Sequence, residues 1–285
     1  MEEVIILDCP EIKCPKVLLI VFEELCGAFE RQGHSIRICN SITEIKGSPI
    51  VFMGNLFQIR NPCSILHKQC PNARYYGWYW HDIPNTNILP NFIHIYENVM
   101  SLTLLPDKIN IMKFMNSIQN KCPLLLRANE DPKKIGRYER QPRRDYCYMG
   151  SVYCPLFVPD EPFKGVYYAS YNHDEYLNYK QRKYIYLTSI FSLGFQSDEN
   201  ILNGHVSQRI FEGLAYGCIV LSNSKCACEQ TEGNVIFIES KEDIQKQMRY
   251  FLDNPLEVIK KQKSGYDFVK RLGTNELSYK KLMEN

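Results

Sequence analysis

Long apolar runs and a secretory signal are both missing from this sequence of 285 residues. No run approaches the roughly 20 apolar residues that cross a bilayer, which excludes a membrane-spanning helix. The first ten residues, MEEVIILDCP, carry acidic side chains where a signal peptide carries basic ones. We therefore expect a cytoplasmic protein with no membrane span. The net charge of +2 argues against a broad basic surface, so no nucleic-acid partner is expected.

Metal-binding cysteine motifs are also missing, although the chain has 12 cysteines. No two of them have C-x-x-C spacing, and Cys226 and Cys228 are too close together for a zinc ribbon. Several cysteines, such as Cys39 and Cys218, lie in apolar segments, where a thiol packs as a small hydrophobic group. The spacing therefore predicts structural thiols and no metal site; the alternative is a metal or disulfide framework.

Short apolar segments alternate with segments of helical periodicity along the whole chain, which predicts an α/β protein with mostly parallel sheets. In the first half, the expected strands are 4–8, 35–39, 49–54, 73–80 and 92–96, and the expected helices are 16–33 and 107–119. In the second half, the expected strands are 146–151, 165–170, 189–195, 218–222 and 234–239, and the expected helices are 205–216, 241–253 and 256–271.

A charged stretch between the halves, NEDPKKIGRYERQPRRD at 129–145, has hardly any apolar residues and is interpreted as a linker. This divides the chain into a first domain over 1–138 and a second over 139–285, with a last helix able to pack back on the first domain. The expected fold class is two Rossmann-like α/β domains that face each other across a cleft. Ligands of open α/β sheets bind beyond the carboxyl ends of the strands, so we expect the site there.

The helix expected at 205–216 has two distinct faces. Its apolar positions recur at four-residue spacing at Val206, Ile210 and Leu214. Its polar positions form a second face at three- and four-residue spacing, and they are His205, Gln208, Arg209 and Glu212. Gly217 follows at the position that favours a left-handed cap before the next strand.

The polar face predicts a site for a nucleoside diphosphate. A helix N-terminus attracts anions through its unpaired amides and its dipole, and the guanidinium of Arg209 suits phosphate. A cation in the first turn is unfavourable for the helix itself, which favours a functional role. Glu212 lies about one turn further along, where its carboxylate can bind ribose hydroxyls. The alternative is a surface ion pair between Arg209 and Glu212.

The segment SQRIFEGLAYGCIVLSN at 207–223 resembles the donor-site helix of glycosyltransferases with the GT-B architecture, particularly the CgeB-like and group 1 families. The resemblance implies that Arg209 binds the donor diphosphate and Glu212 the ribose. It implies further donor contacts from Ser207, Gln208 and His205. The segment YCYMGS at 146–151 resembles the first strand and glycine turn of that family's second domain, which places Gly150 and Ser151 near the phosphates.

The resemblance implies transfer of a sugar from a nucleotide-diphosphate donor, by family frequency a UDP-sugar, to a glycan or glycoprotein. Retaining members have two glutamates separated by seven residues, but Gly204 stands where the first would be, which favours inversion. The Asp-x-Asp motif of the other large glycosyltransferase fold does not occur. We therefore expect a metal-independent reaction without a cofactor.

Inverting transfer needs a base that removes the acceptor proton. The best candidates are His81 and Asp82, because they follow the aromatic strand 73–80 and loops beyond strands carry catalytic groups. Their alternative role is an ordinary turn, capped by Asp82. Glu97, after the strand 92–96, is the next candidate. A weaker pair, which could touch the donor, is His173 and Asp174.

Two other functions fit the same layout. One is a sugar-nucleotide epimerase, and the other is a module that binds a nucleotide sugar or glycan without transferring it. A dinucleotide oxidoreductase is disfavoured because no G-x-G-x-x-G follows an expected strand.

Overall fold

The computed structural model describes residues 3–7, 25–53, 68–79, 98–101, 121–123, 127–150, 158–169, 177–198, 201 and 206–283. The chain forms two compact units. The first comprises Met1–Leu125 together with Asn275–Asn285, and the second comprises Leu126–Thr274. The expected strand at 92–96 and helix at 107–119 lie outside the described residues. Among the helices that are described, none is long and apolar enough to cross a membrane.

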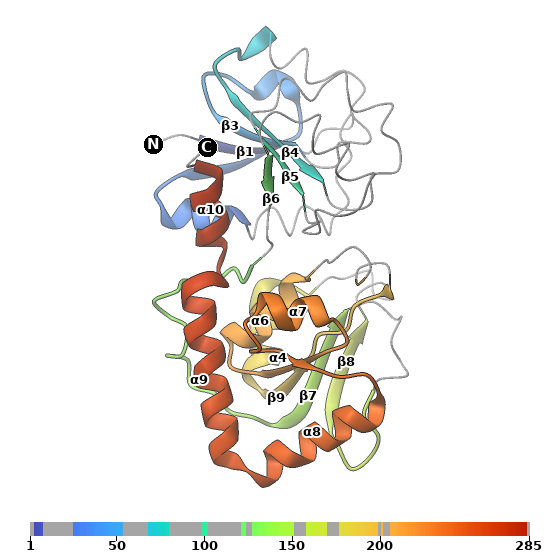
Figure 1. Ribbon diagram of the computed structural model, residues 1–285. Helices are drawn as coiled ribbons and strands as arrows, with labels where there is room; N and C mark the ends of the chain where they lie inside the picture. The colour runs from blue at the N-terminus through green and yellow to red at the C-terminus, as the bar shows by residue number, and fades with distance from the viewer. Residues whose placement is uncertain are drawn as a thin grey trace. The chain divides into compact units, whose positions relative to one another are not determined.

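The first unit is built on a six-stranded sheet in the order β2-β1-β3-β4-β5-β6, in which every pair is parallel (Figure 1). Three consecutive residues of β1, Val4 to Ile6, are fully buried, as expected of a central parallel strand that is covered on both faces. The strands are β1 (Glu3–Leu7), β2 (Ser35–Cys39), β3 (Ile50–Met53), β4 (Arg74–Tyr79), β5 (Asn98–Ser101) and β6 (Lys121–Pro123). A 3-10 turn, η2 (Ile42–Glu44), follows β2.

The last helix, α10 (Asn275–Met283), belongs to the first unit. Its Tyr279 ring packs edge-on against Phe29, with the centroids 4.9 Å apart, and its hydroxyl lies 3.2 Å from Nε2 of His34. Its Glu276 accepts a hydrogen bond from Arg31. The chain therefore returns to the first unit after it has completed the second.

The second unit contains a five-stranded parallel sheet in the order β11-β10-β9-β7-β8. This is the doubly wound order in which the first strand lies beside the second on one side and the third on the other. The order in which strands are added to the sheet reverses between β7 and β9. The carboxyl ends of these two strands therefore form the ligand-binding edge. The strands are β7 (Arg144–Gly150), β8 (Gly165–Ala169), β9 (Ser189–Leu193), β10 (Ile219–Ser222) and β11 (Ile236–Phe237).

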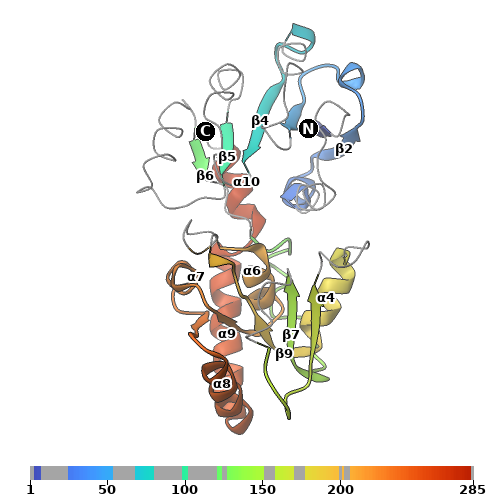
Figure 2. The same cartoon turned by 90° about the vertical axis from the view of Figure 1, so that its right-hand side faces the viewer.

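Helices cover both faces of this sheet (Figures 1 and 2). On one face Phe191 and Leu193 pack with Phe251 of α8, and on the other Val220 packs with α6 and α9. A third cluster joins β7 to Tyr186 of α4. The helices are α4 (Tyr179–Leu187), α6 (Gln208–Ala215), α7 (Lys225–Gln230), α8 (Lys241–Asp253) and α9 (Pro255–Leu272).

The interpretation of 129–145 as a linker is wrong. Within this stretch Ile135 is fully buried and Glu130 is 4 % exposed, and the segment belongs to the second unit. Some of its charged side chains have partners inside that unit: Arg140 donates to the carbonyls of Tyr216 and Ser189. The second unit begins at Leu126, ahead of the expected start of the second domain at 139.

Candidate donor site

Helix α6 begins at the ligand-binding edge of the second sheet. Ser207 is its N-cap residue, with an extended backbone, and the apolar positions Val206, Ile210 and Leu214 are buried as expected. The helix ends before Gly217, whose φ of +78° is the left-handed conformation that the sequence predicts. A Cβ at Gly217 would clash with Tyr266, so the close packing of α9 also requires glycine there.

Arg209 bridges the two strand ends at which the sheet order reverses. Its Nη1 donates to the carbonyl of Met149 in β7, at 3.0 Å, and its Nη2 donates to the carbonyl of Phe195 beyond β9, at 2.8 Å. Its Nε is buried and has no hydrogen-bond partner among the described residues. Because a guanidinium has five N–H donors, these bonds hold the group in place and leave further donors for an anion.

Gly150 provides the space in which Arg209 lies. An added Cβ at Gly150 would clash with Nη1 of Arg209 and would stand 2.7 Å from the hydroxyl oxygen of Tyr148. The family resemblance implied that Gly150 and Arg209 both lie near the donor phosphates, and the structure brings these two residues together.

Glu212 is buried and does not pair with Arg209. Its Oε1 accepts hydrogen bonds from Nη2 of Arg182 and Nε2 of Gln208, both at 3.3 Å. Its Oε2 accepts from the hydroxyl of Tyr186, also at 3.3 Å. With Glu212 only 3 % exposed, the alternative of a surface ion pair between Arg209 and Glu212 is wrong.

Arg182 and Tyr186 were not predicted from the sequence. They lie one turn apart on α4, a helix that was not expected, and together they fix the Glu212 carboxylate. Burial is the main reason that the pKa of Tyr186 lies well above its ordinary value, and the nearby charge of Glu212 raises it further. Tyr186 therefore remains a neutral hydrogen-bond donor. The four-residue spacing of the two residues is the signal that could have identified them.

Two more polar groups at this edge have unused hydrogen-bonding capacity. The buried Oγ of Ser207 neither caps α6 nor has another partner among the described residues. The side chain of Gln196, just beyond β9, is buried, and neither Oε1 nor Nε2 has a partner in the described part of the chain. Gln196 was missed by sequence reasoning, since only its position after an expected strand marks it.

The remaining predicted residues lie outside the described residues. They are His81, Asp82, Glu97, Ser151, His173, Asp174 and His205.

A second cluster of polar side chains, centred on the buried Glu130, also involves helix α4. Glu130 accepts hydrogen bonds from Nζ of Lys183 at 3.0 Å and from the hydroxyls of Tyr179 at 2.8 Å and Tyr216 at 3.0 Å. Burial alone would raise the pKa of Glu130, but hydrogen bonds from Lys183, Tyr179 and Tyr138 and the charge of Lys183 outweigh it, so the pKa lies below its ordinary value. Lys183 also stands 3.6 Å above the ring of Tyr138. The cluster ties 130–138 to α4.

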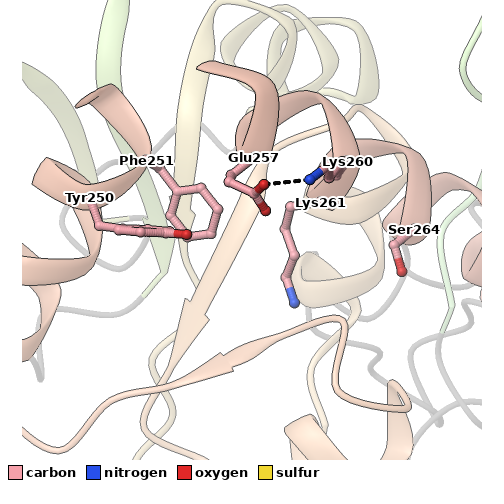
Figure 3. A pocket seen from close by; sticks show the side chains of 6 residues that line it. All are labelled: Tyr250, Phe251, Glu257, Lys260, Lys261 and Ser264. Atoms are coloured by element: carbon pink, nitrogen blue, oxygen red, sulfur yellow. Dashed lines mark hydrogen bonds and ion pairs between the residues drawn. The ribbon is translucent and has the colours of Figure 1, made fainter. Parts of the chain in front are cut away.

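A surface hollow of about 350 Å³ lies between α8 and α9 (Figure 3). It is lined by Tyr250, Phe251, Glu257, Lys260, Lys261 and Ser264, and Lys260 donates to Glu257 across a distance of 2.6 Å. It includes none of the predicted site residues. In the described ranges, no group of three or more His, Cys, Asp or Glu side chains is placed to hold a metal ion.

The protein has an α/β fold, and Arg209 lies at the ligand-binding edge of its second unit. This unit is therefore suited to bind an anionic ligand. The glycosyl transferase-like family matches residues 137–284, which is more than half of the chain, so the protein belongs to this family. The match confirms the group 1 part of the expected resemblance, whereas the CgeB-like part stays a prediction. The comparison with curated protein sequences found no significant match.

Solved structures extend the likeness to the whole chain. An "alpha-glucosyltransferase (AGT) in complex with UDP" aligns with a TM-score of 0.67 and 9% identity over 100% of this chain and 99% of its own. An alpha-glucosyltransferase in complex with UDP-glucose and DNA containing an abasic site aligns with a TM-score of 0.67 and 9% identity over 100% and 98%. At this identity the likeness shows the fold. The expected GT-B class is confirmed. The family match makes the protein a glycosyltransferase.

Proposed function

We propose that the protein transfers a sugar from a UDP-sugar to a hydroxyl group of a glycan or glycoprotein. The observation that carries the proposal is the position of Arg209, whose guanidinium bridges the ends of β7 and β9 where ligands of this sheet order bind. The UDP and UDP-glucose complexes of the alpha-glucosyltransferases support the choice of donor.

In this proposal the second unit binds the donor through its diphosphate and its ribose. The unused N–H donors of Arg209 and the first amides of α6 neutralise the diphosphate, and Ser207 and Gln208 add hydrogen bonds. Gly150, followed by Ser151, allows the phosphates to approach. Glu212 accepts from the ribose hydroxyls, while Arg182 holds its carboxylate in place.

The proposed reaction inverts the anomeric carbon and needs neither a metal nor a cofactor. The acceptor oxygen attacks that carbon as the bond to the diphosphate breaks, and the acceptor proton passes to a base. Asp82, His81 and Glu97 are the proposed bases. Arg209 and the α6 amides then stabilise the charge that develops on the leaving diphosphate, the role that a metal has in other sites.

The acceptor screen covers nucleic acid as well as glycans and glycoproteins. Some of the alpha-glucosyltransferase structures contain DNA, in one case a 13-mer with an HMU base, so the comparisons lend no support to the expectation that nucleic acid is not a partner. An acceptor screen should therefore include DNA with hydroxymethylated bases as well as glycans and glycoproteins. The cytoplasmic location also stays a prediction.

Release of UDP from a panel of UDP-sugars, with and without EDTA, tests the proposed function. We expect acceptor-dependent release by the parent protein that persists in EDTA, a product of inverted anomeric configuration by NMR, and loss of activity in Arg209→Ala. Arg271→Ala is the matched control, because this arginine is exposed on α9 and paired with Glu232. If no UDP-sugar supports transfer to any acceptor, the proposal is wrong. A retained configuration would overturn inversion alone.

A further inference from the structure

Gln196 is held at the ligand-binding edge by its backbone, whereas its side chain has no partner. The amide N–H of Gln196 donates to Oδ1 of Asn223, and Nδ2 of Asn223 donates to the carbonyl of Gln196, both at 2.9 Å. These bonds occupy the Asn223 side chain and extend the pairing of β9 and β10 beyond their last residues. The Gln196 carboxamide, 1 % exposed, keeps its hydrogen-bonding capacity unused within the described residues.

An unpaired carboxamide in this position costs stability. A buried polar group without a partner is unfavourable by about 1–3 kcal/mol, and both the oxygen and the nitrogen of Gln196 are in this condition. Methionine has nearly the same length and would fill the same space without that cost. Such a group in a folded protein calls for an explanation, and a polar ligand would supply the missing partners.

The position of Gln196 relative to Arg209 and α6 narrows the choice of ligand. Phe195, its neighbour in the chain, accepts the hydrogen bond from Nη2 of Arg209. Gly194 packs against α6 so closely that a Cβ there would meet Cγ1 of Ile210 at 2.9 Å. Gln196 therefore lies beside the proposed diphosphate position, next to β10.

Glu212, the proposed ribose ligand, faces the opposite side, because its partners Arg182 and Tyr186 come from α4. In a nucleotide sugar the ribose and base extend from one end of the diphosphate and the sugar from the other. With the ribose on the α4 side of Arg209, the sugar falls on the β10 side, where Gln196 lies.

We propose that the Gln196 carboxamide binds two hydroxyl groups of the donor sugar and so selects which sugar is transferred. This inference rests on the proposed function. A hydroxyl group both donates and accepts, so a pair of hydroxyls satisfies Oε1 and Nε2 together. An ionised phosphate only accepts, and it would leave Oε1 of Gln196 unpaired. Asn223 is the positioning residue, since its side chain fixes the backbone of Gln196.

Calorimetric titration of the parent protein and Gln196→Met with UDP and with UDP-sugars tests the proposal. We expect UDP affinity to change less than two-fold, whereas affinity for the preferred UDP-sugar falls about ten-fold, as two neutral hydrogen bonds imply. A deoxy-sugar donor that lacks one of the two hydroxyls should bind the parent more weakly but bind Gln196→Met like the intact donor. The matched control is Gln247→Met on α8, which should change neither affinity.

The thermal midpoint of Gln196→Met should equal or exceed that of the parent, since an unpaired buried group has been removed. Equal losses of UDP and UDP-sugar affinity would show that Gln196 binds the nucleotide and would overturn the proposal. Unchanged affinity for both ligands would also overturn it. If Gln196→Met does not fold, the deoxy series on the parent decides alone, and the proposal fails if no deoxy position weakens binding. A parent that binds no UDP overturns the proposed function itself, a result distinct from all of these.

Discussion

Replacement of Glu130 by glutamine should destabilise the second unit markedly. Glu130 is 4 % exposed and is the anion that faces Lys183, whose side chain is 23% exposed. Removal of one member of a fully buried ion pair costs about 3–5 kcal/mol, because the other charge is left uncompensated. Partial exposure of Lys183 lets water screen its charge, so we expect Glu130→Gln to lower the free energy of unfolding by about 2–3 kcal/mol. For a domain of this size that is a fall of about 6–9 °C in thermal midpoint.

The effect should depend on pH in one direction. The pKa of Glu130 in the folded protein is below its ordinary value of 4.5, so its contribution to stability is complete above that value. The contribution is lost as the pH falls through the folded pKa. The difference in stability between parent and Glu130→Gln should therefore be constant near neutral pH and shrink as the pH drops below 4.5.

Thermal unfolding followed by circular dichroism at neutral and acidic pH measures both effects. Glu139→Gln is the control, because Glu139 lies in the same segment but is exposed. A change of less than 0.5 kcal/mol in Glu130→Gln at neutral pH, no larger than an ordinary surface substitution, would refute the reasoning. So would a difference from the parent that grows as the pH falls.

Three further outcomes are expected. Gly150→Ala should weaken UDP binding at least ten-fold in a folded protein, because the new methyl group displaces the Arg209 guanidinium. Unchanged affinity would argue against binding of UDP by Arg209 in its present position. Gly217→Ala should lower the thermal midpoint, since its φ of +78° costs an L-residue about 1–2 kcal/mol, and an equal or higher midpoint would be inconsistent with the left-handed cap. Arg182→Gln should lower the free energy of unfolding by about 2 kcal/mol, and so lower the urea midpoint, because it leaves the buried Glu212 without its cation; a midpoint equal to that of the parent would show that the ion pair contributes little.

The parts of the site that lie within one helix could be predicted from the sequence. The four-residue spacing of Val206, Ile210 and Leu214 gave the buried face of α6, and Gly217 gave its end. These features depend on local periodicity and backbone conformation, which the sequence records directly. The position of Arg209 in the first turn of α6 could also be predicted, because the helix leads into the buried strand β10.

The partners of these residues could not be predicted in the same way. Arg182 meets Glu212 across 30 positions of sequence, and Gln196 meets Asn223 across 27. Such contacts depend on how the helices pack on the sheet, and the spacing of residues along the chain does not indicate that packing.

The linker interpretation failed for the same reason. The composition of 129–145 shows that Glu130 is charged, but it does not show that Tyr179 and Lys183, 49 and 53 positions away, make its burial favourable. Pairing in the folded protein removes much of the cost that burial of a charge would otherwise carry.

The most direct measurement is the affinity of the parent protein and Arg209→Ala for UDP and for uridine, by calorimetric titration at one salt concentration. If Arg209 binds the diphosphate, UDP should bind Arg209→Ala about 100-fold more weakly than the parent, as the loss of charge-assisted hydrogen bonds implies, while uridine binds both alike. Equal affinity of the two proteins for UDP would remove the diphosphate from the start of α6 and contradict the assignment of the donor site.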